Sequence, residues 1–203
     1  GFAKARAHRI TYVGELGWEL YVSNDLSNHV FETIMNRNIE HPIKLCGLHT
    51  MDSCRIEKGY KHFGYDISNE DSVLEAGLGF AVKENKPTSK FGEMIGKDSI
   101  IKKRDKGFKN ILLQFRLKDP EPLLYHNEPI LRDGEIVGYL TSGNYGHYLK
   151  GAIGLGYIKC RKLGENIESI LASNYQIDVA GHIIDADVSF KPMYDPKSLK
   201  IKI

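Results

Sequence analysis

Alternation of apolar and polar residues predicts β-strands at both ends of the chain. Near the N-terminus, residues 8–13 and 18–23 alternate aromatic or β-branched residues with polar ones, which is typical of half-buried strands. Residues 14–17 (GELG) between them predict a turn, because both glycines can adopt positive φ. The first 23 residues therefore predict two adjacent antiparallel strands joined by a turn.

Helical spacing follows these strands. Asp25 suits the N-cap of a helix whose apolar residues form one stripe, namely Leu26, Val30, Phe31 and Ile34. A second helix is expected from about Leu48 to Lys58, because Gly59 stands where a C-terminal cap belongs. A short basic helix is expected over residues 97–105. The first half of the chain therefore mixes helices with short strands.

Strand patterns prevail after Gly107. Residues 109–117 predict one strand, and Asp133-Gly134 between two alternating segments favours a type I′ hairpin turn. Further strands are expected in the segments 151–158, 168–173 and 174–190. Because this half is nearly all β, we expect it to close into a small antiparallel barrel.

The change of character along the chain predicts an α+β protein with two domains. Residues 86–92 contain Pro, Thr and Ser in succession and predict a linker, with the domain boundary near residues 93–107. We therefore expect one domain over residues 1–95 and a β-barrel domain over residues 105–203.

Composition and charge narrow the range of partners. The 203 residues carry a formal net charge of +2, and no long basic stripe predicts a nucleic-acid partner. No apolar run approaches the roughly 18 residues that a membrane span needs. The three cysteines lack C-x-x-C spacing, which argues against a zinc site or a disulfide framework and favours a reducing compartment. We expect the cytoplasm, or the mitochondrial matrix if the protein is eukaryotic.

Two residues beside the GELG turn could bind a flat, nitrogen-rich heterocycle. Adjacent antiparallel strands could point Tyr12 and Glu19 at one face, where the carboxylate accepts hydrogen bonds from ring N–H groups and the tyrosine packs on the ring. The alternative is that Glu19 is a solvent-facing carboxylate on a half-buried strand. The pattern alone leaves both interpretations open.

Other candidate motifs carry less weight. Residues 151–156 give G-x-x-G-x-G, but no helix is expected after them, whereas a dinucleotide site needs strand, glycine loop and helix. The eight histidines form no metal-binding spacing, and only His62 stands beside the candidate motifs. Arg55 and Glu57 are expected to pair or cap locally. Cys54 is expected to be a small buried residue rather than a nucleophile.

Five collinear motifs resemble the glycine-cleavage T-protein family. Residues 12–19 (YVGELGWE) resemble the folate-binding segment of that family. Further blocks follow in the family's order over most of the chain, at residues 51–67, 74–82, 128–158 and 194–196. The resemblance implies the C-terminal part of an aminomethyltransferase folate-binding domain, followed by the barrel domain.

The resemblance also implies a function and a set of site residues. It implies tetrahydrofolate-dependent transfer of a one-carbon unit from an amine-derived donor. Carried over residue by residue, Glu19 binds the pteridine ring, while Tyr12 and Tyr60 line the pocket. Tyr194, in the Y-D-P motif, is carried over as a further folate-binding residue, with a structural role at the C-terminus as the alternative.

Two details of the resemblance distinguish branches of the family. Residues 55–64 (RIEKGYKHFG) and 142–146 (SGNYG) resemble the folate domain of dimethylglycine and sarcosine dehydrogenases. Met51 stands where the T-protein has an arginine that helps to bind folate. The hypotheses are therefore an aminomethyltransferase with a lipoyl carrier protein as partner, the folate domain of a flavin-dependent dehydrogenase, or a non-catalytic folate-binding module.

The resemblance assigns no catalytic residue in this sequence. The family's important aspartate belongs to an N-terminal half that the 203 residues do not contain, and Asp52 and Asp66 lie in other motifs. Since the first residue is Gly1, we expect an N-terminal half or a dehydrogenase domain to precede it in the natural protein. Residues 1–203 alone are therefore expected to have no turnover.

Overall fold

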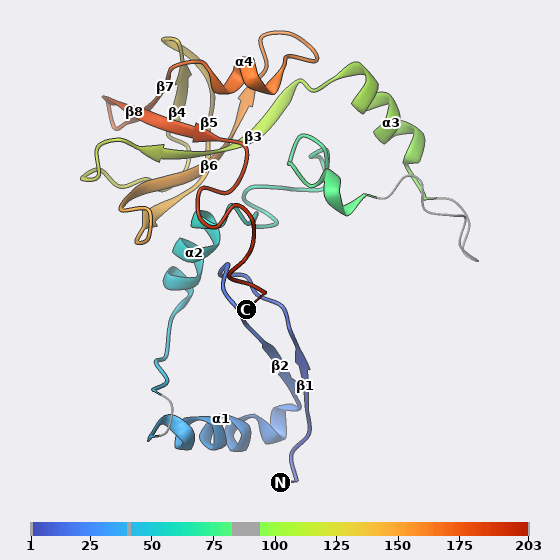
Figure 1. The fold of residues 1–203 in the computed structure, drawn as a ribbon, viewed down its shortest axis with the longest axis vertical. Coiled ribbons are helices and arrows are strands. Elements are labelled where there is room, and N and C mark those ends of the chain that lie inside the picture. Colours follow the sequence, from blue (N-terminus) through green and yellow to red (C-terminus); the bar gives the residue numbers. More distant parts are fainter. Residues whose placement is uncertain (1, 40–41, 83–93, 203) are drawn as a thin grey trace.

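A closed β-barrel and a small two-stranded sheet, connected by helices, make up the fold (Figure 1). The structure is a computed structural model that describes residues 2–39, 42–82 and 94–202. The barrel forms one end of the molecule, and the sheet with its helix extends away from it. The predicted α+β fold with a C-terminal antiparallel barrel is confirmed. Within the described residues, no helix is both long and apolar enough to cross a membrane.

Six antiparallel strands close the barrel in the order β3-β6-β5-β4-β7-β8. Its interior is apolar and includes Leu113, Phe115 and Leu140, none more than 1% exposed. Strand β3 pairs with both β6 and β8, so the sheet has no free edge. The strands are β3 (Asn110–Leu117), β4 (Pro129–Arg132), β5 (Glu135–Gly146), β6 (Gly151–Lys159), β7 (Tyr175–Val179) and β8 (His182–Ser189).

The predicted hairpin at Asp133-Gly134 is confirmed. Arg132 pairs with Glu135, and the two residues between them have φ of 52° and 86°. Positive φ at both central positions is what a type I′ turn requires, and glycine adopts it without a Cβ clash. Turn chemistry thus fixes the register of β4 and β5.

The strand predicted over residues 168–173 is wrong. This segment forms the short helix α4 (Ile167–Leu171), which starts where the Asn166 side chain accepts a hydrogen bond from the Glu168 N–H at 3.0 Å. Ile170 is only 1% exposed and anchors the helix on the barrel. A cap and one buried residue therefore outweigh the strand pattern.

The first predicted strand is displaced. Strand β1 (Ala5–His8) ends where the expected strand begins. Strand β2 (Glu19–Val22) lies within the predicted segment 18–23 and is one residue shorter at each end. After His8 the chain leaves the sheet in a tight loop, in which the Ile10 N–H donates to the His8 carbonyl and the Val13 N–H to the Thr11 hydroxyl. Consequently His8, and not Tyr12, is the cross-strand partner of Glu19. Tyr12 lies outside both strands, so the expectation that two adjacent strands point Tyr12 and Glu19 at one face is wrong.

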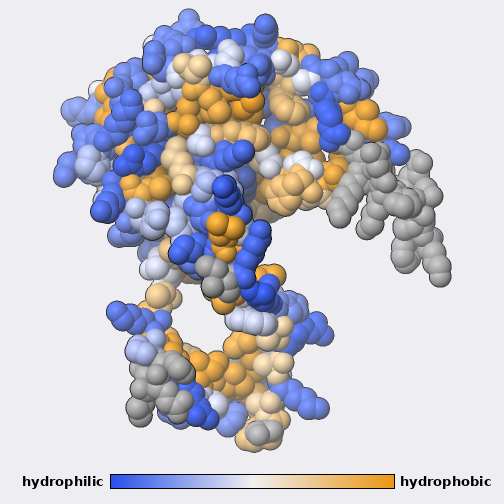
Figure 2. All heavy atoms as spheres, viewed as in Figure 1, coloured by the Kyte–Doolittle hydropathy of each residue, from blue (hydrophilic) through white to orange (hydrophobic). Residues whose placement is uncertain are grey.

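The predicted N-cap at Asp25 is also wrong. Asp25 lies in a short 3₁₀ turn, η1 (Asn24–Leu26), and helix α1 (Ser27–Met35) starts after it without a side-chain cap. The helix buries no residue, and its apolar stripe leaves Phe31 51% and Ile34 39% exposed. Figure 2 shows apolar atoms gathered on the lobe that β1, β2 and α1 form. A further 3₁₀ turn, η2 (Asn36–Ile39), follows.

Helix α2 (Leu48–Glu57) confirms the second predicted helix. Gly59 has φ of 66° and donates its N–H to the Ile56 carbonyl, while the Tyr60 N–H reaches the Arg55 carbonyl. These two bonds are the Schellman motif, which satisfies carbonyls left open at a helix end. The cap therefore fixes the direction of the chain into the segment after Gly59.

In the described part of the chain, two further helical elements follow α2 and precede the first barrel strand, β3. They are the 3₁₀ turn η3 (Gly79–Ala81) and helix α3 (Lys97–Lys106), the latter matching the predicted basic helix. The predicted linker at residues 86–92 lies outside the described residues. The domain boundary near residues 93–107 stays a prediction.

Candidate functional site

Helix α2 and its C-cap residue, Lys58, bury polar side chains, most of them against the barrel. Ser53, Arg55, Glu57 and Lys58 are each at most 5% exposed. Polar groups tolerate burial only when they are hydrogen-bonded, and each of these side chains has a partner. The last turn of α2 is held in the same way, because the Gln114 amide on β3 donates to the Ile56 carbonyl at 2.6 Å. Helix and barrel thus share one polar interface.

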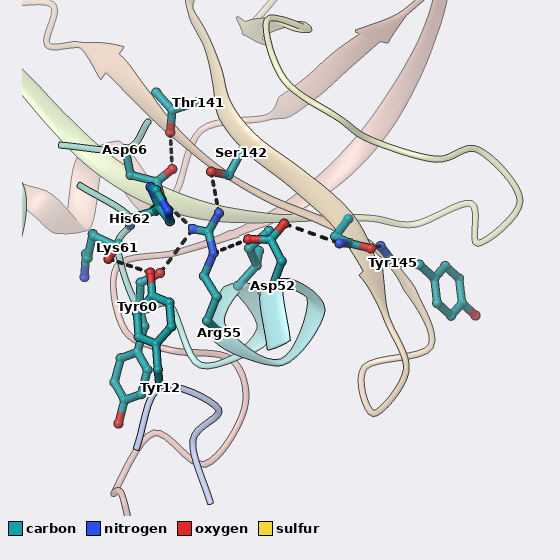
Figure 3. Close-up of polar contacts among 12 residues, drawn as sticks. Tyr12, Asp52, Arg55, Tyr60, Lys61, His62, Asp66, Thr141, Ser142 and Tyr145 are labelled. Atoms are coloured by element: carbon teal, nitrogen blue, oxygen red, sulfur yellow. Dashed lines mark hydrogen bonds and ion pairs between the residues drawn. The ribbon is translucent and has the colours of Figure 1, made fainter. Parts of the chain in front are cut away.

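Arg55 is the centre of this interface (Figure 3). Its guanidinium forms ion pairs with Asp66 and with Asp52, the latter at 2.6 Å. It also donates to the Ser142 hydroxyl on β5 at 2.8 Å and to the Tyr60 carbonyl at 3.3 Å. One buried cation therefore joins α2, the segment after it and the barrel.

Asp66 is held from three sides. Besides Arg55, its carboxylate accepts the Thr141 hydroxyl at 2.6 Å and the His62 backbone N–H at 2.9 Å. Asp66 is 1% exposed, so its charge depends on these partners. The expected local pairing of Arg55 is confirmed, because Asp52 lies three residues away. Arg55 also binds partners farther away in the sequence, Asp66 and Ser142. Glu57 does not pair locally; it accepts two backbone N–H groups near the β5–β6 turn.

Tyr12 and Tyr60 lie together beside this network. Their rings are parallel within 8°, with centroids 6.1 Å apart. The Tyr12 hydroxyl donates to the Lys61 carbonyl at 2.9 Å, and both rings are half-buried. Burial raises the pKa of both phenols above their usual value, and Asp195 adds to the effect at Tyr60. The pair is therefore a neutral aromatic surface with one ring anchored to the backbone.

The other two predicted site residues lie elsewhere. Glu19 is exposed on β2 and accepts the Tyr21 hydroxyl at 2.7 Å. Tyr194 is 8% exposed, and its hydroxyl donates to Glu15 in the GELG turn. Among the described contacts, none joins either residue to the tyrosine pair. The predicted folate contacts of these four residues remain predictions.

A cavity of about 710 Å³ opens between α2 and β5. Met51 lines it, at the position where the resemblance expects an arginine. The Nδ1 atom of His62, another lining residue, is buried without a hydrogen-bond partner. In the described residues no group of three or more His, Cys, Asp or Glu side chains could hold a metal ion.

Sequence reasoning missed most of this network. It named Arg55 only for local pairing and gave no role to Lys58, Ser142 or Thr141. One signal was present: four polar residues fall within six positions of a helix that is followed by a tight glycine cap. Such a helix has no apolar stripe to explain its packing, so its polar residues require buried partners.

Two family models match the chain, one on each side of α3. The "GCVT N-terminal domain" matches residues 1–86, and the "Glycine cleavage T-protein C-terminal barrel domain" matches residues 111–195. The chain belongs to the glycine cleavage T-protein family. The family predicted from the five motifs is thereby confirmed.

Relatives of this T-protein family chain include both transferases and oxidoreductases. It is 34% identical over 194 residues to 4-methylaminobutanoate oxidase (formaldehyde-forming) from Paenarthrobacter nicotinovorans, covering 96% of this chain and 22% of the relative. It is 35% identical over 171 residues to the aminomethyltransferase of Halothermothrix orenii, covering 83% and 46% respectively. The chain therefore spans from about a fifth to about half the length of these relatives.

A solved structure supports the fold independently. Glycine cleavage system aminomethyltransferase T from Bartonella henselae superimposes with a TM-score of 0.76 at 20% identity. The match covers 92% of this chain and 48% of that one. Mammalian sarcosine and dimethylglycine dehydrogenases match as well, as the RIEKGYKHFG and SGNYG strings predicted.

Proposed function

We propose that this T-protein chain binds tetrahydrofolate and takes part in transfer of a one-carbon unit to it. The observation that carries the proposal is the Tyr12–Tyr60 pair, two parallel and half-buried rings at positions where the family lines its folate pocket. A pteridine is a flat, nitrogen-rich heterocycle, and such rings stack well on aromatic faces.

The geometry of the pair limits how a ring can bind. Optimal carbon–carbon contact needs about 3.5 Å, so a ring inserted between the tyrosines would require roughly 7 Å. The centroids are 6.1 Å apart, which leaves no room for it. The heterocycle would therefore stack on an outer face of the pair. Binding on an outer face would not require the two rings to separate.

Glu19 would supply the polar anchor. Its Oε2 accepts the Tyr21 hydroxyl, and a carboxylate has further acceptor sites for the N–H groups of a pteridine. Hydrogen bonds to a charged group contribute about 1.5–3 kcal/mol each. Glu19 lies on the strand that directly follows the GELG turn, so the turn sets where the carboxylate stands relative to Tyr12.

The chain's own residues would bind and orient rather than perform proton transfer. Bound tetrahydrofolate would supply a nucleophilic nitrogen as the acceptor of the one-carbon unit. Asp52 and Asp66, two carboxylates whose charges act on Tyr12, are both engaged by Arg55, and we assign neither a catalytic role. Positioning and exclusion of water would be the contribution of this part.

A second candidate is the folate domain of a flavin-dependent amine dehydrogenase. It is favoured by the relatives, since the sarcosine dehydrogenase of Homo sapiens aligns with 97% of this chain over only 21% of its own length. Flavin would then belong to another domain. In the aminomethyltransferase case the partner would be a lipoyl carrier protein. Measuring whether the natural protein oxidises N-methyl amines separates the two.

Calorimetric titration with a reduced folate tests folate binding. Tyr12→Leu and Tyr60→Leu each remove one ring, and we expect about tenfold weaker binding, because an aromatic pair contributes about 0.5–1.5 kcal/mol beyond its buried area. Tyr139→Leu is the matched control, since Tyr139 is 59% exposed on the barrel. Unchanged affinity in both pair variants, or no binding by the wild type, would refute the proposal.

A further inference from the structure

The chain that leaves the barrel returns to the GELG turn and to α2. Figure 1 shows the C-terminus close to the loop between β1 and β2. The Met193 N–H donates to the Gln114 side chain at 2.7 Å, and the Tyr194 N–H reaches the Glu57 carbonyl at 3.3 Å. The Tyr194 hydroxyl donates to Glu15. Four separate parts of the sequence therefore meet here.

A buried ion pair secures this return. Lys58 is 1% exposed, and its ammonium donates to the Asp195 carbonyl at 2.6 Å and to the Asp195 carboxylate at 2.9 Å. The carboxylate also accepts the backbone N–H groups of Leu199 and Lys200. A buried lysine requires such pairing, because its charge has been removed from water and would otherwise be uncompensated.

The aliphatic part of the Lys58 side chain supports the GELG turn. Gly14 is buried with φ of 78°, and a Cβ added to it would lie 2.9 Å from Lys58 Cγ. No side chain fits there, so the turn rests directly on the lysine. Gly14 stands two residues after Tyr12, and Lys58 stands two residues before Tyr60. This contact therefore lies equally close in sequence to both rings of the pair.

We propose that Glu15, Lys58 and Tyr194 are positioning residues that set the spacing of the Tyr12–Tyr60 pair. Tyr194 acts through Glu15, not by touching a ligand. Its ring is buried, packing edge-on against Tyr148 at 4.6 Å with the Lys58 ammonium 5.9 Å above it. The C-terminal segment thus contacts the turn at Glu15, while Lys58 contacts it at Gly14. The inference rests on the proposed function for its effect on folate, but not for its effect on the ring spacing.

The first test detects a change in the surroundings of the Tyr60 ring, which is expected when its spacing from Tyr12 changes. In the full-length protein labelled with 3-fluorotyrosine, the ¹⁹F resonance of Tyr60 is assigned by its loss in Tyr60→Phe. Tyr194→Phe keeps the buried ring and removes only the bond to Glu15, and Glu15→Ala removes the same bond from the other side. We expect the Tyr60 resonance to shift in both variants. Asp185→Ala, which removes an exposed side-chain bond to Gln176 on the barrel, is the control and should not shift it.

The second test measures reduced-folate affinity by calorimetry in the same variants. We expect about tenfold weaker binding in Tyr194→Phe and in Glu15→Ala, and no further loss in the double variant, because both remove one shared bond. Melting temperatures should stay close to that of the control.

The outcomes of the two tests separate the inference from the proposed function. An unshifted Tyr60 resonance overturns the inference whether or not folate binds. Additive losses of affinity in the double variant also overturn it. If wild type binds no folate but the resonance shifts, the proposed function fails and the positioning role stands.

Discussion

Removing the charge of Arg55 tests whether the polar interface stabilises the fold. Arg55→Met keeps much of the side-chain length but leaves Asp66, 1% exposed, without the cation that contacts it directly. The Thr141 hydroxyl and His62 N–H would remain, yet neither carries a charge. Breaking a buried ion pair by removing one partner typically costs about 3–5 kcal/mol. For a protein of this size, that corresponds to a melting temperature lower by roughly 6–20 °C.

Urea denaturation and calorimetry measure the loss. Arg161→Met is the matched control, because Arg161 and its partner Asp133 are 51% and 34% exposed and such pairs contribute about 0–1 kcal/mol. Adding Asp66→Leu to Arg55→Met should restore part of the stability by removing the uncompensated carboxylate. A loss no larger than that of the control, or no recovery in the double variant, would refute the argument.

Three further predictions concern single residues. Gly134→Val should lower the free energy of unfolding by about 1 kcal/mol or more, because a β-branched residue resists a φ of 86°; an unchanged melting temperature would contradict this. Hydrogen bonds from Arg132 hold the pKa of the Glu165 carboxyl below its usual value. The ionised Glu165 therefore contributes fully to stability above the unfolded pKa of about 4.3, and this contribution is lost as pH falls through the folded pKa. In Glu165→Gln the free energy of unfolding should therefore fall less steeply as the pH is lowered. Identical curves for the variant and the wild type would count against this role of Glu165. Glu19→Gln should weaken reduced-folate binding by about tenfold with little change in stability, whereas a change within twofold by calorimetry would make Glu19 a surface carboxylate.

Local signals sufficed where backbone chemistry decides the structure. Gly134 and Gly59 take positive φ in a hairpin and in a helix cap, and both were predictable because few other residues adopt that conformation. Dense strand patterning after Gly107 likewise predicted the barrel. The turn, the cap and the individual strands depend on residues close together in sequence, whereas closure of the barrel pairs β3 with the distant β8.

Local signals failed where two of them competed. Residues 168–173 carry a strand-like pattern, but the Asn166 cap and the burial of Ile170 make them helical. Residues 8–13 also alternate, but the strand ends at His8, and the residues after it form a loop. Which signal prevails depends on contacts with the rest of the fold, which periodicity does not report.

The sequence alone determined the family, the barrel and the two tyrosines of the candidate site; only the tertiary structure decided how they are held. Arg55 meets Ser142 across 87 positions, Lys58 meets Asp195 across 137, and Glu15 meets Tyr194 across 179. Apolar periodicity predicts burial of apolar side chains, because their removal from water is favourable without any specific partner. Burial of a charged side chain depends instead on a specific partner, and the chain brings that partner close only when it folds.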